Sequence, residues 1–161
     1  NIAEMGLINR LLPNAKIITA LRDPRDVCLS CFMQGFQPDD AMTNFNELQS
    51  SVQLYELVME YWLHCRQNMA LPWIEFRYED LTRDFEACSR RVLDFIDIPW
   101  SDDIKQYRDG ILARPITTPG FRDMTIPMYT HAVGRWLKYR QHLEPTYEPL
   151  EPFIGDFGYT E

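Results

Sequence analysis

The chain of 161 residues contains no apolar run that approaches the roughly 20 residues needed to cross a bilayer. No charged stretch followed by an apolar one opens it, so we find no secretion signal and expect a soluble protein. The chain also lacks an excess of basic residues. Its formal charge of −8 opposes non-specific binding to nucleic acid or to an anionic membrane. A bound anion must therefore be held by a local cluster of arginines and backbone N–H groups.

Motifs for metal binding and for ATP binding are absent as well. Cys28 and Cys31 form a CxxC pair, but no second pair and no nearby histidine supplies the other ligands of a zinc site. We expect these two cysteines to be reduced and to face the core from a helix, with a redox role as the alternative. Reduced cysteines favour the cytoplasm. The missing Gly-x-x-x-x-Gly-Lys motif and Mg²⁺ ligands argue against a P-loop nucleotide kinase.

The composition and the order of the predicted elements are those of one α/β domain. Hydrophobic residues make up 45 % and aromatic residues 13 % of the chain, which leaves little room for disorder. Strands and helices alternate, and this order predicts a parallel sheet flanked by helices. The spacing of apolar residues predicts helices at 2–12, 24–36 and 130–142, a long helix that ends at 68 and another helix that begins at 82. It predicts strands at 15–21 and 73–78.

Several element boundaries carry local signals. Asp23 is expected to cap the second helix, with Pro24 at its first position. Asn44 and Glu47 have the spacing of a capping box for the long helix. The first strand is expected to be buried on both faces, and residues 112–128 are expected to form an irregular loop. Two strands make a small sheet and the chain opens within a helix, so an N-terminal portion of the domain is expected to be absent.

The stretch after the first strand is the strongest candidate for a binding site. Ligands of open parallel sheets bind beyond the carboxyl ends of the strands, where helix N-termini also favour anions. Arg22 lies at such a place, and its fork can donate two charge-assisted hydrogen bonds to a phosphate. Ser30, further along the helix, can donate its hydroxyl to the same group. Alternatively, Arg22 pairs with Asp23 or Asp26 and only ties the turn together.

Two further residues have two interpretations each. Tyr78, at the end of the second predicted strand, is either a core aromatic or a platform for a base. Arg135 is either a ligand-binding residue or part of a solvated basic face shared with Lys138. Residue spacing alone favours the structural interpretation for both.

Three segments together resemble a known family. They are "LPNAKIITALRDPRDVCLSCF", "FRYEDLTRDFEACSRRVLDFIDIPW" and "IPMYTHAVGRWLKY". In this order they resemble successive signatures of the sulfotransferases that use 3′-phosphoadenosine 5′-phosphosulfate (PAPS), closest to the bacterial branch related to the tyrosylprotein sulfotransferases. The resemblance implies an α/β, P-loop NTPase-like sulfotransferase fold. Residues 1–161 would form the C-terminal portion of a single domain, without its N-terminal strand and phosphosulfate loop.

The resemblance also implies roles for individual residues. Arg22 and Ser30 correspond to the arginine and serine that clamp the 3′-phosphate of the nucleotide. Tyr78 corresponds to the tyrosine that lines the adenosine site. Arg135 stands where relatives place a basic residue that reaches the phosphates from the C-terminal helix.

Two positions depart from the family pattern. Gly120 stands where relatives carry a serine that helps to hold the phosphosulfate, and Thr117 and Thr118 nearby are candidates to replace it. Thr125 stands where the bacterial branch often has an arginine, and Arg122 is the nearest arginine. These departures leave room for an altered site.

The function implied by the resemblance is transfer of a sulfuryl group from PAPS to an acceptor hydroxyl, either a tyrosine or a small alcohol. The product nucleotide is 3′,5′-adenosine bisphosphate (PAP), no metal is required, and neither nucleic acid nor membrane is a partner. The catalytic base and the phosphosulfate loop are expected upstream of residue 1, so this fragment alone should be inactive. The three histidines are expected to be surface or packing residues: His64, His131 and His142. The alternative is a non-catalytic module of the same fold that binds nucleotide or acts as a scaffold.

Overall fold

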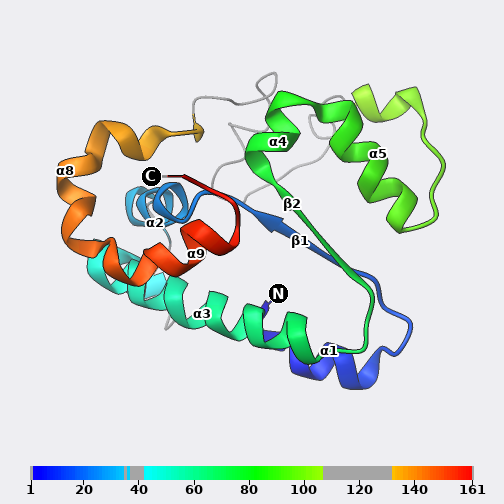
Figure 1. Ribbon diagram of the computed structural model, residues 1–161, viewed down its shortest axis with the longest axis horizontal. Helices are drawn as coiled ribbons and strands as arrows, with labels where there is room; N and C mark the ends of the chain where they lie inside the picture. Colours follow the sequence, from blue (N-terminus) through cyan, green and yellow to red (C-terminus); the bar gives the residue numbers. More distant parts are fainter. Residues whose placement is uncertain (1, 35, 37–41, 107–131, 161) are drawn as a thin grey trace.

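A two-stranded parallel sheet lies at the centre of the computed structural model, with helices on both sides (Figure 1). β1 (Ile17–Leu21) pairs with β2 (Trp73–Arg77), and Leu21 is opposite Arg77 at the carboxyl ends. α2 (Pro24–Met33) and α3 (Leu48–Asn68) connect the two strands. The predicted parallel α/β arrangement is therefore confirmed for these strands. The residues described are 2–34, 36, 42–106 and 132–160.

Shorter elements surround this βαβ unit. α3 lies along one side of the sheet, and α4 and α5 follow β2 on the other side (Figure 1). Within the described ranges, no helix combines the length and apolar character needed to span a bilayer. The elements not yet introduced are η1 (Ile2–Glu4), α1 (Met5–Leu11), α4 (Tyr78–Arg83), α5 (Phe85–Phe95), η3 (Asp102–Gln106), η5 (Arg135–Tyr139), α8 (Arg140–Leu143), η6 (Glu144–Thr146), η7 (Glu148–Leu150) and α9 (Glu151–Asp156).

The main core covers one face of β1. Ile17 and Leu21 pack in a cluster with residues of α3 and α9, whereas Ile18, which points the other way, is 39 % exposed. The prediction that this strand is buried on both faces is therefore wrong. Alternation along the strand places every second side chain on the core face. The buried members of the core are Met5, Ile17, Leu21, Met59, Trp62, Cys65, Leu71, Phe153 and Phe157.

The helix start at Asp23 is confirmed, but the capping box of the long helix is not. The Asp23 carboxylate accepts the backbone N–H of Arg25 at 2.9 Å, and Pro24 is the first helical residue. α3 begins only at Leu48, after a 3-10 helix η2 (Met42–Asn46), and no side chain caps it at Glu47. There, the Ser51 hydroxyl donates to the Glu47 carbonyl at 2.8 Å. The predicted end of this helix at residue 68 is confirmed.

The helices after β2 also differ from the prediction. α4 begins directly at Tyr78, four residues before the predicted start at Thr82. It is followed by α5, because the Asp84 carboxylate accepts the backbone N–H of Ala87 at 2.9 Å and starts a new helix. The C-terminal helix predicted at 130–142 is, in its described part, the 3-10 helix η5 followed by the short α8, since Gly134 adopts a left-handed conformation. Residues 107–131, which contain the predicted irregular loop, lie outside the described part.

Candidate functional site

The site predicted at the carboxyl ends of the strands begins with two neighbouring side chains. Leu21 and Arg77 are paired at these ends, so the residues that follow them, Arg22 and Tyr78, lie close together. The guanidinium carbon of Arg22 is 5.6 Å from the centroid of the Tyr78 ring, a cation–π distance. The register of the parallel sheet thus brings together two of the site residues predicted from the sequence.

Arg22 reaches across the molecule rather than back to its own turn. Its Nη2 donates to the backbone carbonyl of Ala132 at 2.6 Å. Its Nε is buried and has no hydrogen-bond partner among the residues that the structure describes. The alternative in which Arg22 ties the turn is not what the structure shows, because the turn is closed by Arg25 and its pair with Asp23.

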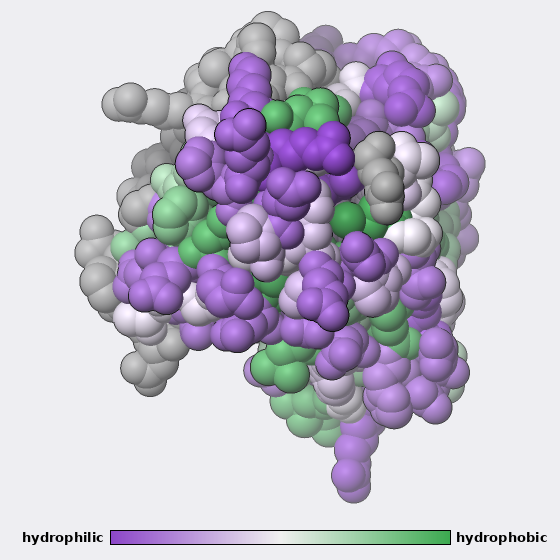
Figure 2. Space-filling view, turned by 60° about the vertical axis from the view of Figure 1, so that its left-hand side comes forward, coloured by the Kyte–Doolittle hydropathy of each residue, from purple (hydrophilic) through white to green (hydrophobic). Residues whose placement is uncertain are grey.

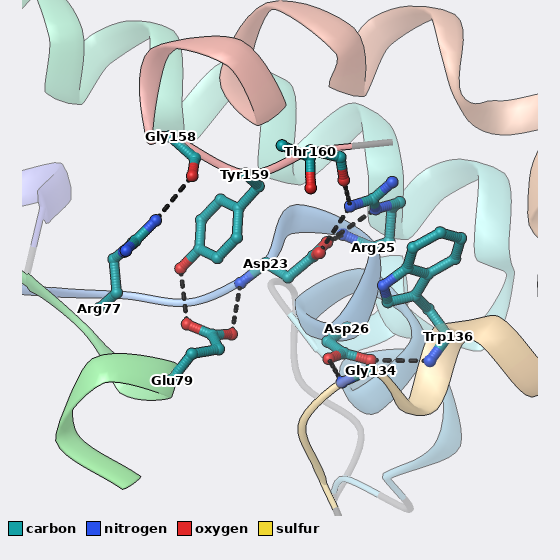
Figure 3. A network of polar contacts seen from close by, with 10 residues as sticks. All are labelled: Asp23, Arg25, Asp26, Arg77, Glu79, Gly134, Trp136, Gly158, Tyr159 and Thr160. Atoms are coloured by element: carbon teal, nitrogen blue, oxygen red, sulfur yellow. Dashed lines mark hydrogen bonds and ion pairs between the residues drawn. The ribbon is translucent and has the colours of Figure 1, made fainter. Parts of the chain in front are cut away.

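The Arg25–Asp23 ion pair is buried and bidentate (Figure 3). Arg25, which is 2 % exposed, donates from Nε to one Asp23 oxygen at 2.9 Å and from Nη2 to the other at 2.7 Å. Its Nη2 also donates to the carbonyl of Thr160 at 2.7 Å, and its guanidinium carbon lies 3.7 Å from the ring centroid of Trp136. One arginine therefore joins the first turn of α2 to two segments near the C-terminus.

Asp26 holds the backbone of the segment that contains Arg135. Its two carboxylate oxygens accept the backbone N–H groups of Gly134 at 2.7 Å and Trp136 at 2.8 Å (Figure 3). Burial raises the pKa of Asp26 above its usual range, while these two N–H groups and the nearby Arg22 act in the opposite direction. Arg135 itself is half-buried and is the first residue of η5.

Glu79 joins both strand ends to the C-terminal residues. One oxygen accepts the backbone N–H of Asp23 at 3.0 Å, and the other accepts the Tyr159 hydroxyl at 2.7 Å (Figure 3). Arg77, at the end of β2, donates to the carbonyl of Gly158 at 2.6 Å. The residues at 158–160 therefore lie across the carboxyl ends of both strands.

Tyr159 should make folding sensitive to alkaline pH. Burial and then the hydrogen bond to the Glu79 carboxylate raise the pKa of this hydroxyl far above its ordinary value of about 10. The folded state therefore keeps a proton that the unfolded state loses, and stability falls as pH rises past about 10. We expect Tyr159→Phe to flatten this loss between about pH 9 and about pH 11 in urea denaturation. Tyr139→Phe, in η5, is the control, and an equal flattening in both variants would contradict the prediction.

The remaining predicted residues are less closely joined. Ser30 is half-buried on α2, one helical turn beyond Asp26. His64 and His142 are exposed, as expected for surface histidines. The other selected positions lie outside the described residues, and they are Thr117, Thr118, Gly120, Arg122, Thr125 and His131.

The residues that build the network of Figure 3 were not predicted from the sequence. From the sequence, Asp26 was expected in the first turn of the helix or as an ion-pair partner of Arg22, and Arg25 and Glu79 had no expected role. Arg25 and Asp26 are 2 % and 1 % exposed, whereas charged residues are rarely buried unless they are paired. The signal was the density of charges directly after both strands, in RDPRD and YED, which exceeds what one helix cap requires.

The cysteines take no part in this network. All four are free thiols, and burial raises the pKa of Cys28 well above its usual range. A protonated, buried thiol is a poor nucleophile, which favours the structural interpretation over a redox role. Within the described ranges, no group of three or more acidic, histidine or cysteine side chains has the arrangement of a metal site.

The polar network is distinct from the polar surface. On the face shown in Figure 2, hydrophilic side chains cover most of the area and hydrophobic ones form smaller patches between them. Arg25 and Asp26, in contrast, are buried, so their charges are satisfied by internal partners rather than by water.

These features define an α/β protein whose candidate site lies at the carboxyl ends of parallel strands, beside the N-terminus of a helix. A model of the sulfotransferase family matches residues 1–102, which is most of the chain, and the chain belongs to that family. The match includes both strands and α2 to α5. A protein of Aquifex aeolicus (strain VF5), described as "Uncharacterized protein", is 27 % identical over 155 residues. That alignment covers 94 % of this chain and 20 % of the Aquifex protein, so the chain spans about a fifth of that relative's length.

Proposed function

We propose that the protein containing this chain transfers a sulfuryl group from PAPS to the hydroxyl of a tyrosine or a small alcohol. The observation that carries the proposal is Arg22, which lies at the strand ends beside a helix N-terminus in a member of the sulfotransferase family. As in the related tyrosylprotein branch, the acceptor would be an alcohol or phenol. The cytoplasm, where free cysteines persist, is the compartment that we propose.

The donor groups around Arg22 fit an anionic nucleotide. The bond to Ala132 uses one of the five N–H donors of the guanidinium, and the buried Nε has no acceptor within the described part of the chain. A buried donor without an acceptor is costly, and a phosphate oxygen would satisfy it. Because the chain has a formal charge of −8, such a local cluster is needed to hold an anion at all.

Each selected residue has a role in this proposal. Arg22 and Ser30 would hold the 3′-phosphate, Tyr78 would line the adenosine site, and Arg135 would reach the phosphates. Thr117 and Thr118 would contribute hydroxyls to the phosphosulfate side. When bound, PAPS supplies the sulfuryl group that passes to the acceptor oxygen, and PAP remains.

The part of catalysis that this chain supplies is positioning and charge stabilisation. Sulfuryl transfer resembles phosphoryl transfer, which passes through a loose, in-line transition state. Catalysis of such a reaction depends mainly on orientation of the reactants and on electrostatic stabilisation. The guanidinium groups of Arg22 and Arg135 would orient the nucleotide and offset the charge of the leaving phosphate. The helix N-terminus at Pro24 adds its dipole in the same direction.

Binding of PAP by the full-length protein tests the nucleotide site. At about 100 times its dissociation constant, PAP should stabilise the protein by about 2.7 kcal/mol. Arg22→Ala should remove about 2 kcal/mol of this gain, because an arginine fork makes charge-assisted hydrogen bonds worth about 1.5–3 kcal/mol. Thermal unfolding with and without PAP measures both values. Arg83→Ala is the matched control, since the Arg83 side chain is 74 % exposed, and equal shifts in both variants would contradict the assignment.

Transfer from labelled PAPS to mixed phenols and alcohols tests the reaction itself. A non-catalytic module of the same fold would bind PAP without turnover. The residues that keep this alternative open, Gly120 and Thr125, lie outside the described part of the chain. PAP binding with no labelled product would support the binding module instead of the transferase.

A further inference from the structure

The segment around Arg135 is attached to the RDPRD stretch at several points. Asp26 accepts the backbone N–H groups of Gly134 and Trp136, which lie 108 and 110 positions further along the chain. These are the two residues on either side of Arg135. We propose that Asp26 is a positioning residue for Arg135, and this inference rests on the nucleotide site proposed above.

Two hydrogen bonds to one carboxylate restrict the backbone of the residue between them. The carboxylate is planar and, at 1 % exposure, buried, so its two oxygens are fixed in space. The N–H groups of Gly134 and Trp136 are bound to these oxygens at 2.7 and 2.8 Å. Rotation about the backbone of Arg135 would break at least one bond, so the direction in which its side chain leaves the backbone is set by Asp26.

Two further contacts and one backbone bend hold the same segment. Arg22 donates to the Ala132 carbonyl at 2.6 Å, and the Arg25 guanidinium lies 3.7 Å from the centre of the Trp136 ring. Gly134 has a φ of 66°, a left-handed conformation that glycine adopts without the penalty of a side chain. The bend at residue 134 therefore turns the chain so that the N–H groups of Gly134 and Trp136 both meet the Asp26 carboxylate.

Pre-organisation is the advantage that such a clamp gives to an anion site. Arginine loses considerable rotational freedom when it binds, and a backbone that is already fixed lowers this cost. A carboxylate next to Arg22 would otherwise be a poor choice, because its negative charge repels a phosphate. The geometry therefore points to a positional rather than an electrostatic benefit from Asp26.

The direction in which one substitution changes PAP affinity separates the positional effect from the electrostatic one. Asp26→Asn removes a negative charge and keeps the shape of the side chain. If Asp26 acted on the nucleotide only through its charge, this variant would bind PAP more tightly. If it positions Arg135, binding becomes weaker, because the amide NH₂ group faces a backbone N–H and one of the two hydrogen bonds is lost.

The experiment is a calorimetric titration of the full-length protein with PAP at about pH 8, well above the ordinary range of a carboxyl pKa. The variants are Asp26→Asn, Arg135→Ala and the double variant. We expect each single variant to bind PAP about tenfold more weakly, which corresponds to about 1.4 kcal/mol. The double variant should bind no more weakly than Arg135→Ala alone, since a clamp has no effect on a side chain that is absent.

A matched control distinguishes positioning from general destabilisation. Asp84 also accepts a backbone N–H, that of Ala87 at 2.9 Å, but at the start of α5. Asp84→Ala, which removes this helix cap, should lower the melting temperature without changing PAP affinity. If Asp26→Asn does not fold, Gly134→Ala is the substitute variant, because a side chain strains the left-handed backbone at residue 134. Its effect on PAP affinity should also vanish when the Arg135 side chain is absent.

The outcomes separate this inference from the proposed function. If the wild-type protein does not bind PAP, the proposed nucleotide site fails, and the positioning role fails with it. If the wild-type protein binds PAP and Arg135→Ala weakens binding, unchanged or tighter binding by Asp26→Asn overturns the positioning role alone. Additive losses in the double variant would overturn it as well.

Discussion

Arg25→Met should lower the free energy of unfolding by about 3–5 kcal/mol, the usual cost of removing one partner from a buried ion pair. The side chains of Arg25 and Asp23 are 3 % and 10 % exposed, so the substitution leaves an uncompensated carboxylate in a place that water barely reaches. Methionine retains much of the volume beside Trp136, which separates the electrostatic loss from a cavity. Urea denaturation, with a comparison of midpoints at constant slope, measures the change.

A second variant tests the cause of that loss. Asp23→Asn in the Arg25→Met background removes the unpaired charge, so the double variant should be more stable than Arg25→Met alone. Arg83→Met, at a side chain 74 % exposed and paired with Asp80, is the matched surface control and should change stability by about 0.5 kcal/mol or less. If Arg25→Met and Arg83→Met cost the same, the buried pair does not stabilise this turn.

The sequence predicted the local features of the fold better than its long-range contacts. The strand at residues 17–21, the helix that starts at Pro24 and the strand at 73–77 each follow from apolar runs and their flanking turn residues. The parallel register then placed Arg22 beside Tyr78, as expected for residues at adjacent strand ends. These are consequences of short-range patterns and of one general rule for parallel sheets.

Boundaries failed where a side chain outside the apolar pattern decided them. Tyr78 begins α4 immediately, and Asp84 starts α5 by capping Ala87, so a helix expected from Thr82 became two. The exposed side of β1 was missed for a related reason. A short run of Ile, Thr and Ala looks the same whether one face or both faces are covered, and only the position of α3 and α9 decides which.

The polar network could not be predicted from the sequence, because its partners are far apart in the chain. Asp26 and Trp136 are 110 positions apart, and Tyr159 lies 80 positions from Glu79. Nothing in the periodicity of either segment specifies the other. What the sequence does contain is a surplus of charges at both strand ends, and in a domain with a substantial core such charges must find partners when they are buried.

Asp26→Ala should strongly destabilise the junction between α2 and η5. It leaves the N–H groups of Gly134 and Trp136 without their acceptor in a buried place, at about 1–3 kcal/mol for each. We therefore expect a loss of about 2–6 kcal/mol in the free energy of unfolding, with Asp26→Asn intermediate because its amide oxygen still accepts one hydrogen bond. Urea denaturation at neutral pH measures all three proteins.

The pH dependence of these variants has a definite sign. Burial raises the pKa of Asp26, so the folded state takes up a proton at a higher pH than the unfolded state. Stability from this residue is thus greatest at low pH and falls as pH rises from about 4 through the raised pKa. Asp26→Ala and Asp26→Asn both lack this titration. The difference in the free energy of unfolding between the wild-type protein and each variant should therefore become smaller as pH rises from about 4 through the raised pKa. A gap that widens with pH would show that the two N–H groups, rather than burial, dominate the ionisation of Asp26, since hydrogen bonds to the carboxylate favour its charged form.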